Sequence, residues 1–291
     1  MPKKYCFSIS NHATFYKYLV YSIKANCMKT KLLLFNAFLL IFNCTNESVT
    51  QPEGQACDNG TFVGDVILTT QQEVEDFGAM CYTKIDGKLY IGKGTNEDSD
   101  IHDLSYLNNL TEVYNSNPDR NQLSEIWVVK NPNLTNLEGL HNITKTAGVI
   151  ISRNDRLASL SGLEGLTQIH YHPGFSAIVI LNNDALESLD GLHNIVSIGS
   201  PDFTVFDYIG ISIQGNDLLT NLEALSNIND IYGSVFIGTH EDDVYYEGNA
   251  ALTDFCGLTN LFSNGGSDLV LIDNNAFNPT VQDIIDGNCS Q

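Results

Sequence analysis

Residues 178–195 read Ile-Val-Ile-Leu-Asn-Asn-Asp-Ala-Leu-Glu-Ser-Leu-Asp-Gly-Leu-His-Asn-Ile, and this stretch contains one complete unit of a repeat. The unit joins an apolar pair spaced by two, Ile178 and Ile180, to Asn183 and then to a leucine or isoleucine at every third position. Self-similarity at a period of roughly 20–50 residues is typical of solenoids and repeat arrays. Copies of this unit account for most of the chain.

The other copies share the form Asn-x-x-Leu-x-x-Leu/Phe-x-x-Leu-x-x-Leu/Ile. A degenerate copy lies at residues 104–110 and a truncated copy begins at Asn275. The spacings between successive asparagines are 23, 29, 33, 33 and 26, so the unit varies in length. The complete copies other than the one above begin at Asn131, Asn154, Asn216 and Asn249.

The apolar pair of each copy predicts a short strand, because a spacing of two places both side chains on one face. The leucines cannot form a long helix, since Gly139, Gly162 and Gly191 interrupt them, and we expect tight turns that direct a leucine inward at each corner. The sequence therefore predicts a mainly β fold, a single parallel β-helix or leucine-rich solenoid of about seven coils around a continuous apolar core. The pairs are Leu89/Ile91, Ile126/Val128, Val149/Ile151, Ile178/Ile180, Ile211/Ile213, Val235/Ile237 and Val270/Ile272.

The recurrent asparagine is predicted to be a scaffold residue and not a ligand site. Stacked on one another, these side chains would hydrogen-bond the turn backbone, which a buried polar group requires.

The two ends of the solenoid carry signals for covering helices. Residues 65–68 are expected to form a strand, and residues 70–73, Thr-Gln-Gln-Glu, are a capping box that predicts a short helix with Val74 and Phe77 facing inward. Residues 281–285 are expected to form a second short helix, tied down by Cys289. Solenoids need such end caps to cover the open coil.

Charge divides the chain near residue 43. The chain carries 14 Lys+Arg and 35 Asp+Glu, and residues 1–43 hold six of the basic residues and none of the acidic ones. Residues 28–31 are basic, and the apolar run 32–42 is too short to span a bilayer but suits the core of a signal peptide. We therefore expect an upstream extension at 1–27 with the true start at Met28, a signal peptide at 28–43, a polar linker at 44–56 and the solenoid at 57–291.

The end of the apolar run resembles a bacterial lipoprotein signal, in which Cys44 would become the lipidated first residue. Asn43 stands where Gly, Ala or Ser is more usual, which leaves ordinary signal cleavage as the alternative. The expected location is the outer membrane or cell surface, with a lipid as the only membrane attachment, or the secreted fraction.

Four further cysteines lie in pairs at the two ends of the solenoid: Cys57, Cys81, Cys256 and Cys289. None forms a Cys-x-x-Cys pair, so a zinc site is not expected. In an exported protein they allow three pairings, of which the local one joins Cys57 to Cys81 and Cys256 to Cys289. Four free buried thiols are the alternative.

Residues 81–91, Cys-Tyr-Thr-Lys-Ile-Asp-Gly-Lys-Leu-Tyr-Ile, resemble the opening of a receptor L domain. This family is the leucine-rich right-handed β-helix of the insulin and epidermal growth factor receptor ectodomains. The cysteine, the glycine and Leu-x-Ile match, as do the leucine blocks downstream, over about residues 57–289. The resemblance implies a fold and a binding role, and it does not imply receptor signalling. Bacterial surface proteins also use domains of this kind.

The residue between the two members of each apolar pair is expected to point outward from the sheet. An exposed apolar row of this kind marks an interaction surface, although cross-strand packing within the sheet is the alternative. The row consists of Tyr90, Trp127, Ile150, Val179, Ser212, Phe236 and Leu271.

Insertions before several strands are expected to place aromatic residues along one edge of the sheet, beside this row. Insertions in repeat proteins often line the binding face, and the alternative is that these side chains pack under their own loops. The aromatic residues are Tyr114, Tyr171, Phe175, Phe203, Phe206 and Tyr208.

No metal or cofactor is predicted. The acidic loops 96–100 and 240–243 carry oxygen ligands that calcium uses, but the twelve-residue calcium loop pattern is absent and solvated loops are favoured. His170 and His172 have no evident third metal ligand. A net charge of −21 argues against nucleic acid, and the sequence contains no phosphate loop, nucleophile elbow or His-Glu-x-x-His motif.

These patterns favour a non-enzymatic surface module for recognition or adhesion, which binds a protein or a glycan through the outward row and the loops before the strands. A carbohydrate-active β-helix enzyme with paired carboxylates is one alternative, and a structural envelope protein is the other. Only eight Lys+Arg follow residue 43, which makes a lyase for acidic sugars hard to support.

Overall fold

The structure, a computed structural model, describes residues 58–94, 97–116, 124–169, 177–199, 209–238, 248–264 and 269–291. These residues belong to one compact unit, Ala56–Gln291.

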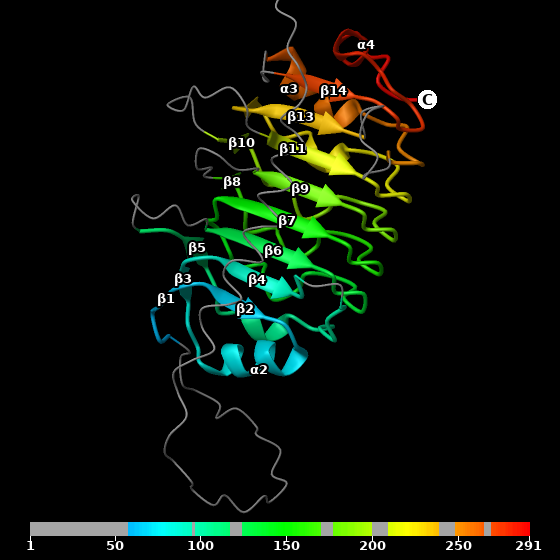
Figure 1. Ribbon diagram of the computed structural model, residues 1–291. Helices are drawn as coiled ribbons and strands as arrows, with labels where there is room; N and C mark the ends of the chain where they lie inside the picture. Colours follow the sequence, from blue (N-terminus) through cyan, green and yellow to red (C-terminus); the bar gives the residue numbers. More distant parts are fainter. Residues whose placement is uncertain are drawn as a thin grey trace, which may run out of the picture. The chain divides into compact units, whose positions relative to one another are not determined.

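Within the described residues, the largest sheet has eight strands in the order β14-β13-β11-β9-β7-β6-β4-β2, and all its pairings are parallel (Figure 1). Each strand lies next to the strand of the preceding repeat, as in a solenoid-like stack. The predicted mainly β, parallel architecture is thereby confirmed. The strands are β2 (Val66–Leu68), β4 (Leu89–Gly92), β6 (Glu125–Val129), β7 (Gly148–Ser152), β9 (Ile178–Leu181), β11 (Ile209–Gln214), β13 (Ser234–Ile237) and β14 (Val270–Ile272).

Two small parallel sheets, which the sequence did not predict, lie on the segments that lead into the large sheet. Their orders are β1-β3-β5 and β12-β10-β8, and bridges from Lys145 to Glu112 and from Thr146 to Ile169 continue the pairing between them. Each strand has only two or three residues, which is too short to show periodicity. The strands are β1 (Thr61–Val63), β3 (Lys84–Asp86), β5 (Glu112–Tyr114), β8 (Gln168–Ile169), β10 (Ser197–Ile198) and β12 (Asp230–Ile231).

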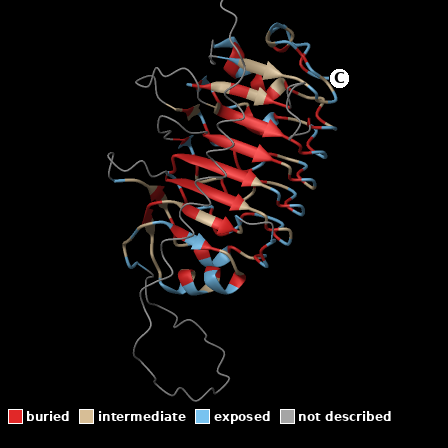
Figure 2. Ribbon diagram, in the orientation of Figure 1, coloured by how far each residue is buried: buried red, intermediate tan, exposed pale blue. Residues whose placement is uncertain are grey.

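The core is filled by the inward apolar pairs and by the leucines of the return path. Leu137, Leu160 and Leu189 are at most 2% exposed. In Figure 2 the strands β6, β7, β9 and β11 are largely buried, whereas much of the helix that follows β2 is exposed. The described part of the return path consists of turns, 3-10 helices and one five-residue α-helix at Thr259–Ser263, and not of a long helix, as predicted. The 3-10 helices are η1 (Ser105–Leu107), η2 (Glu223–Leu225) and η3 (Cys256–Leu258).

Glycines allow the return paths of neighbouring repeats to touch. Gly139, Gly162 and Gly191 have φ between +109° and +111°, a conformation that residues with a Cβ rarely adopt. A Cβ on Gly191 would lie 2.0 Å from the carbonyl oxygen of Leu160. The glycines that exclude a helix in the sequence therefore also set the distance between coils.

The asparagine ladder is present as predicted. Asn131, Asn154, Asn183, Asn216 and Asn249 are fully buried, and each donates both its backbone N–H and its side-chain Nδ2 to the Oδ1 of the next asparagine. Each Nδ2 also donates to a backbone carbonyl of the preceding strand. These side chains are fully engaged within the scaffold.

Both predicted end helices are present. Helix α2 (Gln71–Ala79) begins at the Thr70 capping box and buries Val74 and Phe77. Helix α4 (Val281–Ile285) begins at a second capping box, formed by Thr280 and Asp283. A further short helix, α3 (Thr259–Ser263), was not predicted.

A disulfide joins Cys256 to Cys289, with 5.0 Å between the Cα atoms, and confirms one of the two local pairings. Cys81 is also disulfide-bonded, whereas Cys57 lies outside the described residues, as does Cys44. The helices in the described part of the chain do not combine the length and the hydropathy that a membrane span requires.

Candidate functional site

The outward row predicted from the sequence is aligned in register across the large sheet. Ile67 on β2 precedes it, and its members pair in order from Tyr90 on β4 to Leu271 on β14. We call the row from Ile67 to Leu271 the outer row. Its members are Ile67, Tyr90, Trp127, Ile150, Val179, Ser212, Phe236 and Leu271.

The prediction that this whole row is exposed is wrong. Trp127, Ile150 and Val179 are 7%, 8% and 9% exposed. Parallel strands lie about 4.8 Å apart, so large side chains in register cover one another. The accessible members lie toward the two ends of the row: Ile67 is 61% exposed, and Tyr90, Phe236 and Leu271 are partly exposed.

A polar and aromatic cluster lies on the same face, on β4, on β6 and at the residue that precedes β4. The rings of Tyr90 and Trp127 are stacked with 5.9 Å between their centroids and 27° between their planes. The Nζ of Lys88 lies 4.8 Å from the centroid of the Trp127 ring. Trp127 Nε1 donates to Glu125 Oε2 at 2.6 Å. We call Lys88, Tyr90, Glu125 and Trp127 the β4–β6 cluster.

Burial controls the protonation of this cluster. Glu125 is 3% exposed, and its burial raises its pKa to about 7, although the charge of Lys88 and the bond from Trp127 act in the opposite direction. Burial also raises the pKa of Tyr90 to about 12. Glu125 is therefore a buried carboxyl group that changes charge near neutral pH.

The sequence contained a signal for this cluster that the prediction did not use. Lys88 and Glu125 each come directly before an inward residue, Leu89 and Ile126, so alternation places them on the outer face beside the outer row. A charged residue directly before a buried strand position indicates a polar group held at the sheet surface.

Most of the predicted aromatic rim falls outside the part of the chain that the structure describes. Tyr171, Phe175, Phe203, Phe206 and Tyr208 lie outside the described residues, as do His170, His172 and the acidic loop 240–243. Tyr114 ends β5 in a small sheet, and the Nζ of Lys145 lies 5.4 Å from its ring centroid.

Acidic residues also recur along the turns that follow the ladder asparagines. Partial desolvation, and then the carboxylates of Asp184 and Asp98, raise the pKa of Asp155. These side chains therefore repel one another along the stack. Within the part of the chain that the structure describes, no group of three or more His, Cys, Asp or Glu could hold a metal ion.

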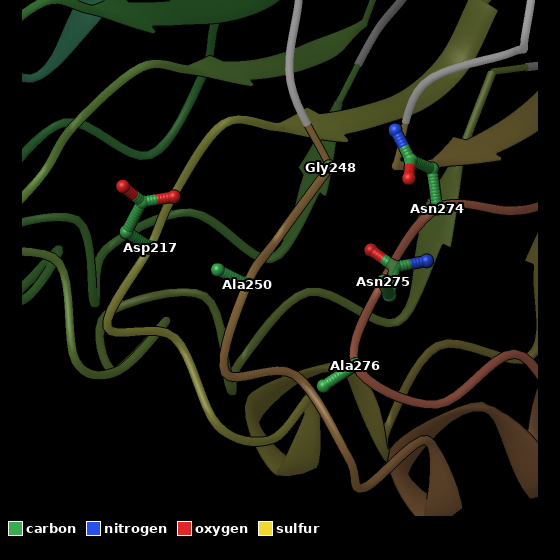
Figure 3. A pocket seen from close by; sticks show the side chains of 6 residues that line it. All are labelled: Asp217, Gly248, Ala250, Asn274, Asn275 and Ala276. Atoms are coloured by element: carbon green, nitrogen blue, oxygen red, sulfur yellow. The ribbon is translucent and has the colours of Figure 1, made fainter.

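An open pocket of about 390 Å³ lies near the C-terminal end of the ladder. Figure 3 shows Asp217 on one side of it and Asn274 and Asn275 on the other, with Gly248, Ala250 and Ala276 between them. Asn275 is already engaged by the ladder and by Asn278. The pocket thus offers few free polar groups to a ligand, and the outer face of the large sheet is the stronger candidate.

Comparisons with protein-family models, with curated proteins and with solved structures found no match for this chain.

Proposed function

We propose that this protein is a non-enzymatic, exported recognition module that binds a protein ligand through the outer face of its large sheet. The observation that carries the proposal is the outer row, which is in register on all eight strands of the described sheet, is apolar except at Ser212, and lies on the face opposite the core. Its accessible members are Ile67, Tyr90, Phe236 and Leu271. The core does not need these side chains, because the inward pairs and leucines fill it. Accessible apolar side chains outside a filled core are typical of an interaction surface.

The receptor L-domain resemblance supports the same proposal. On this view the parallel stack is a right-handed β-helix of about seven coils, and Cys44 carries a lipid that holds the module at the cell surface. The parallel sheet and the Cys256–Cys289 disulfide agree with such a domain.

A protein ligand is favoured over a glycan. Sugars stack on open aromatic faces, but Trp127 is only 7% exposed and Lys88 lies over its ring. The most exposed member of the outer row, Ile67, is aliphatic and offers no hydrogen bond. Apolar anchors of this kind are typical of protein interfaces.

The chemistry of Glu125 supports binding over glycoside hydrolysis. Hydrolases of this type use two carboxyl groups about 5–9.5 Å apart. The raised pKa of Glu125 is caused by burial, and no other carboxyl group contributes to it. In the described residues Glu125 thus has no acidic partner that affects its protonation.

The test uses the chain without residues 1–43, probed against a protein array and a glycan array. Ile67→Asp should weaken binding to the protein ligand at least tenfold, because it places a charge in an apolar contact, with little effect on the melting temperature. Leu218→Asp is the matched control: Leu218 is 48% exposed but lies in a turn outside the sheet. Equal binding by the two variants would contradict the proposed surface. Hits among glycans alone would replace the protein ligand with a sugar, and turnover of an arrayed polysaccharide would indicate the enzyme.

A further inference from the structure

The β4–β6 cluster brings a carboxyl group, an ammonium group and an indole together on the outer face. Trp127 Nε1 donates to Glu125 Oε2 at 2.6 Å, and Lys88 Nζ is 4.8 Å from the centroid of the same indole. The indole of Trp127 therefore connects the carboxyl group of Glu125 with the ammonium group of Lys88.

We propose that Glu125, Trp127 and Lys88 form a proton-operated latch, in which the ionised Glu125 holds Lys88 against the sheet and the protonated Glu125 releases it. This inference concerns the molecule alone and does not depend on the proposed ligand.

The physical basis of the latch is the cost of a buried charge. A carboxylate that is 3% exposed must be compensated by donors or by an opposite charge. Trp127 supplies one hydrogen-bond donor to Glu125, and Lys88 supplies the positive charge that favours its ionised form. When Glu125 takes up a proton this requirement ends, and the strongly hydrated ammonium of Lys88 gains by turning to solvent. Protonation thus adds one uncompensated positive charge to the outer face.

The other charged groups near the cluster do not replace Glu125 in this role. From β4, Tyr90 stays neutral because its pKa is raised to about 12. The side chain of Asp65, before β2, accepts from the backbone N–H of Lys88. On β5, Glu112 pairs with Lys84 at 2.6 Å.

On the other side of Glu125, β7 presents Gly148 and Ile150, which carry no charge. Lys145, before β7, lies over the ring of Tyr114 on β5. Lys88 is the charge that acts on Glu125.

The experiment follows the intrinsic fluorescence of Trp127, the single tryptophan of the chain, in the folded full chain between pH 5 and 9. We expect one transition that involves one proton and has its midpoint near pH 7. Glu125→Gln should abolish the transition, because the amide does not titrate. Lys88→Met should raise the midpoint by about one pH unit, since a nearby positive charge favours the ionised carboxyl group. Glu112→Gln is the matched control and should leave the midpoint unchanged.

Three results of these titrations would overturn the latch. A transition that persists in Glu125→Gln would assign it to another group, such as a histidine, and overturn the latch. A wild-type protein without a transition, or a Lys88→Met midpoint equal to that of the wild type, would also overturn it. If Glu125→Gln does not fold, the wild-type and Lys88→Met titrations still test the proposal.

Discussion

Replacing Asn183 by Ala removes five side-chain hydrogen-bond contacts from the interior of the stack. The Oδ1 of Asn183 accepts from the backbone N–H and the Nδ2 of Asn154, and the two hydrogens of its own Nδ2 are shared among Ile151 O, Leu181 O and Asn216 Oδ1. Asn183 is fully buried. Water cannot replace these bonds unless the coils separate, so the change leaves polar groups unpaired.

The expected loss follows from the groups that have no other partner. Asn216 Oδ1 still accepts from the backbone N–H of residue 183, and Leu181 O still accepts from Arg153. The backbone N–H of Asn154 and one hydrogen of its Nδ2 lose their acceptor. Two buried donors without an acceptor cost about 1–3 kcal/mol each, or about 4 kcal/mol together. For a unit of this size, that corresponds to a fall of roughly 8–16 °C in melting temperature.

The assay is thermal unfolding followed by circular dichroism, with Asn194→Ala as the matched control. Asn194 is exposed and donates a single bond to Glu164 O at 2.8 Å, so its loss should cost less than about 1 kcal/mol. If the two variants melt within about 2 °C of each other, the ladder contributes no more than a surface asparagine, and our account of it is refuted.

Three other predictions concern stability. The raised pKa of Glu125 stabilises the protonated fold by roughly 3 kcal/mol below pH 4.5, and this stabilisation is lost as pH rises through 7. The free energy of unfolding of the wild type should therefore fall between pH 4.5 and about 7. Glu125→Gln should reduce this fall. Urea unfolding at pH 5 and pH 8 measures it, and a difference between variant and wild type that is the same at both values would contradict it. Gly191→Ala should lower the free energy of unfolding by several kcal/mol, because its Cβ would lie 2.0 Å from Leu160 O. Gly287→Ala is also at positive φ (+84°) but has open space around it, so it should lower the free energy of unfolding by only about 1 kcal/mol. Equal melting temperatures of the two variants would refute the close approach at Gly191. Cys289→Ser opens a disulfide that spans 33 residues and should cost roughly 3–4 kcal/mol; a reducing agent should then lower the melting temperature of the variant less than that of the wild type.

The scaffold was predictable because the sequence of each repeat determines the strand and the turns of that repeat. A spacing of two marks the inward residues, as at Ile178 and Ile180, and the glycines exclude a helix between them. The asparagine has to be paired once it is buried, so its role follows from its recurrence.

The outer face was less predictable because its properties depend on neighbours from other repeats. Trp127 points outward as expected, but it is buried beside Tyr90 and Lys88, which come from another repeat. The pKa of Glu125 likewise depends on packing, which a single repeat does not encode. The small sheets were missed because Ile169 and Ile198 are single inward residues with no periodic partner.

The asparagine ladder also makes the number of coils adjustable. Every junction is the same: an asparagine donates its backbone N–H and its Nδ2 to the Oδ1 of the next asparagine, whether 23 or 33 residues separate them. Ser99 donates to the first asparagine and Asn278 accepts from the last, so the ends are satisfied separately from the middle. A segment that runs from one asparagine to the next, such as residues 184–216, can therefore be duplicated or deleted and leave an intact junction. Growth by such whole segments offers this architecture a route to longer or shorter modules with the same ends.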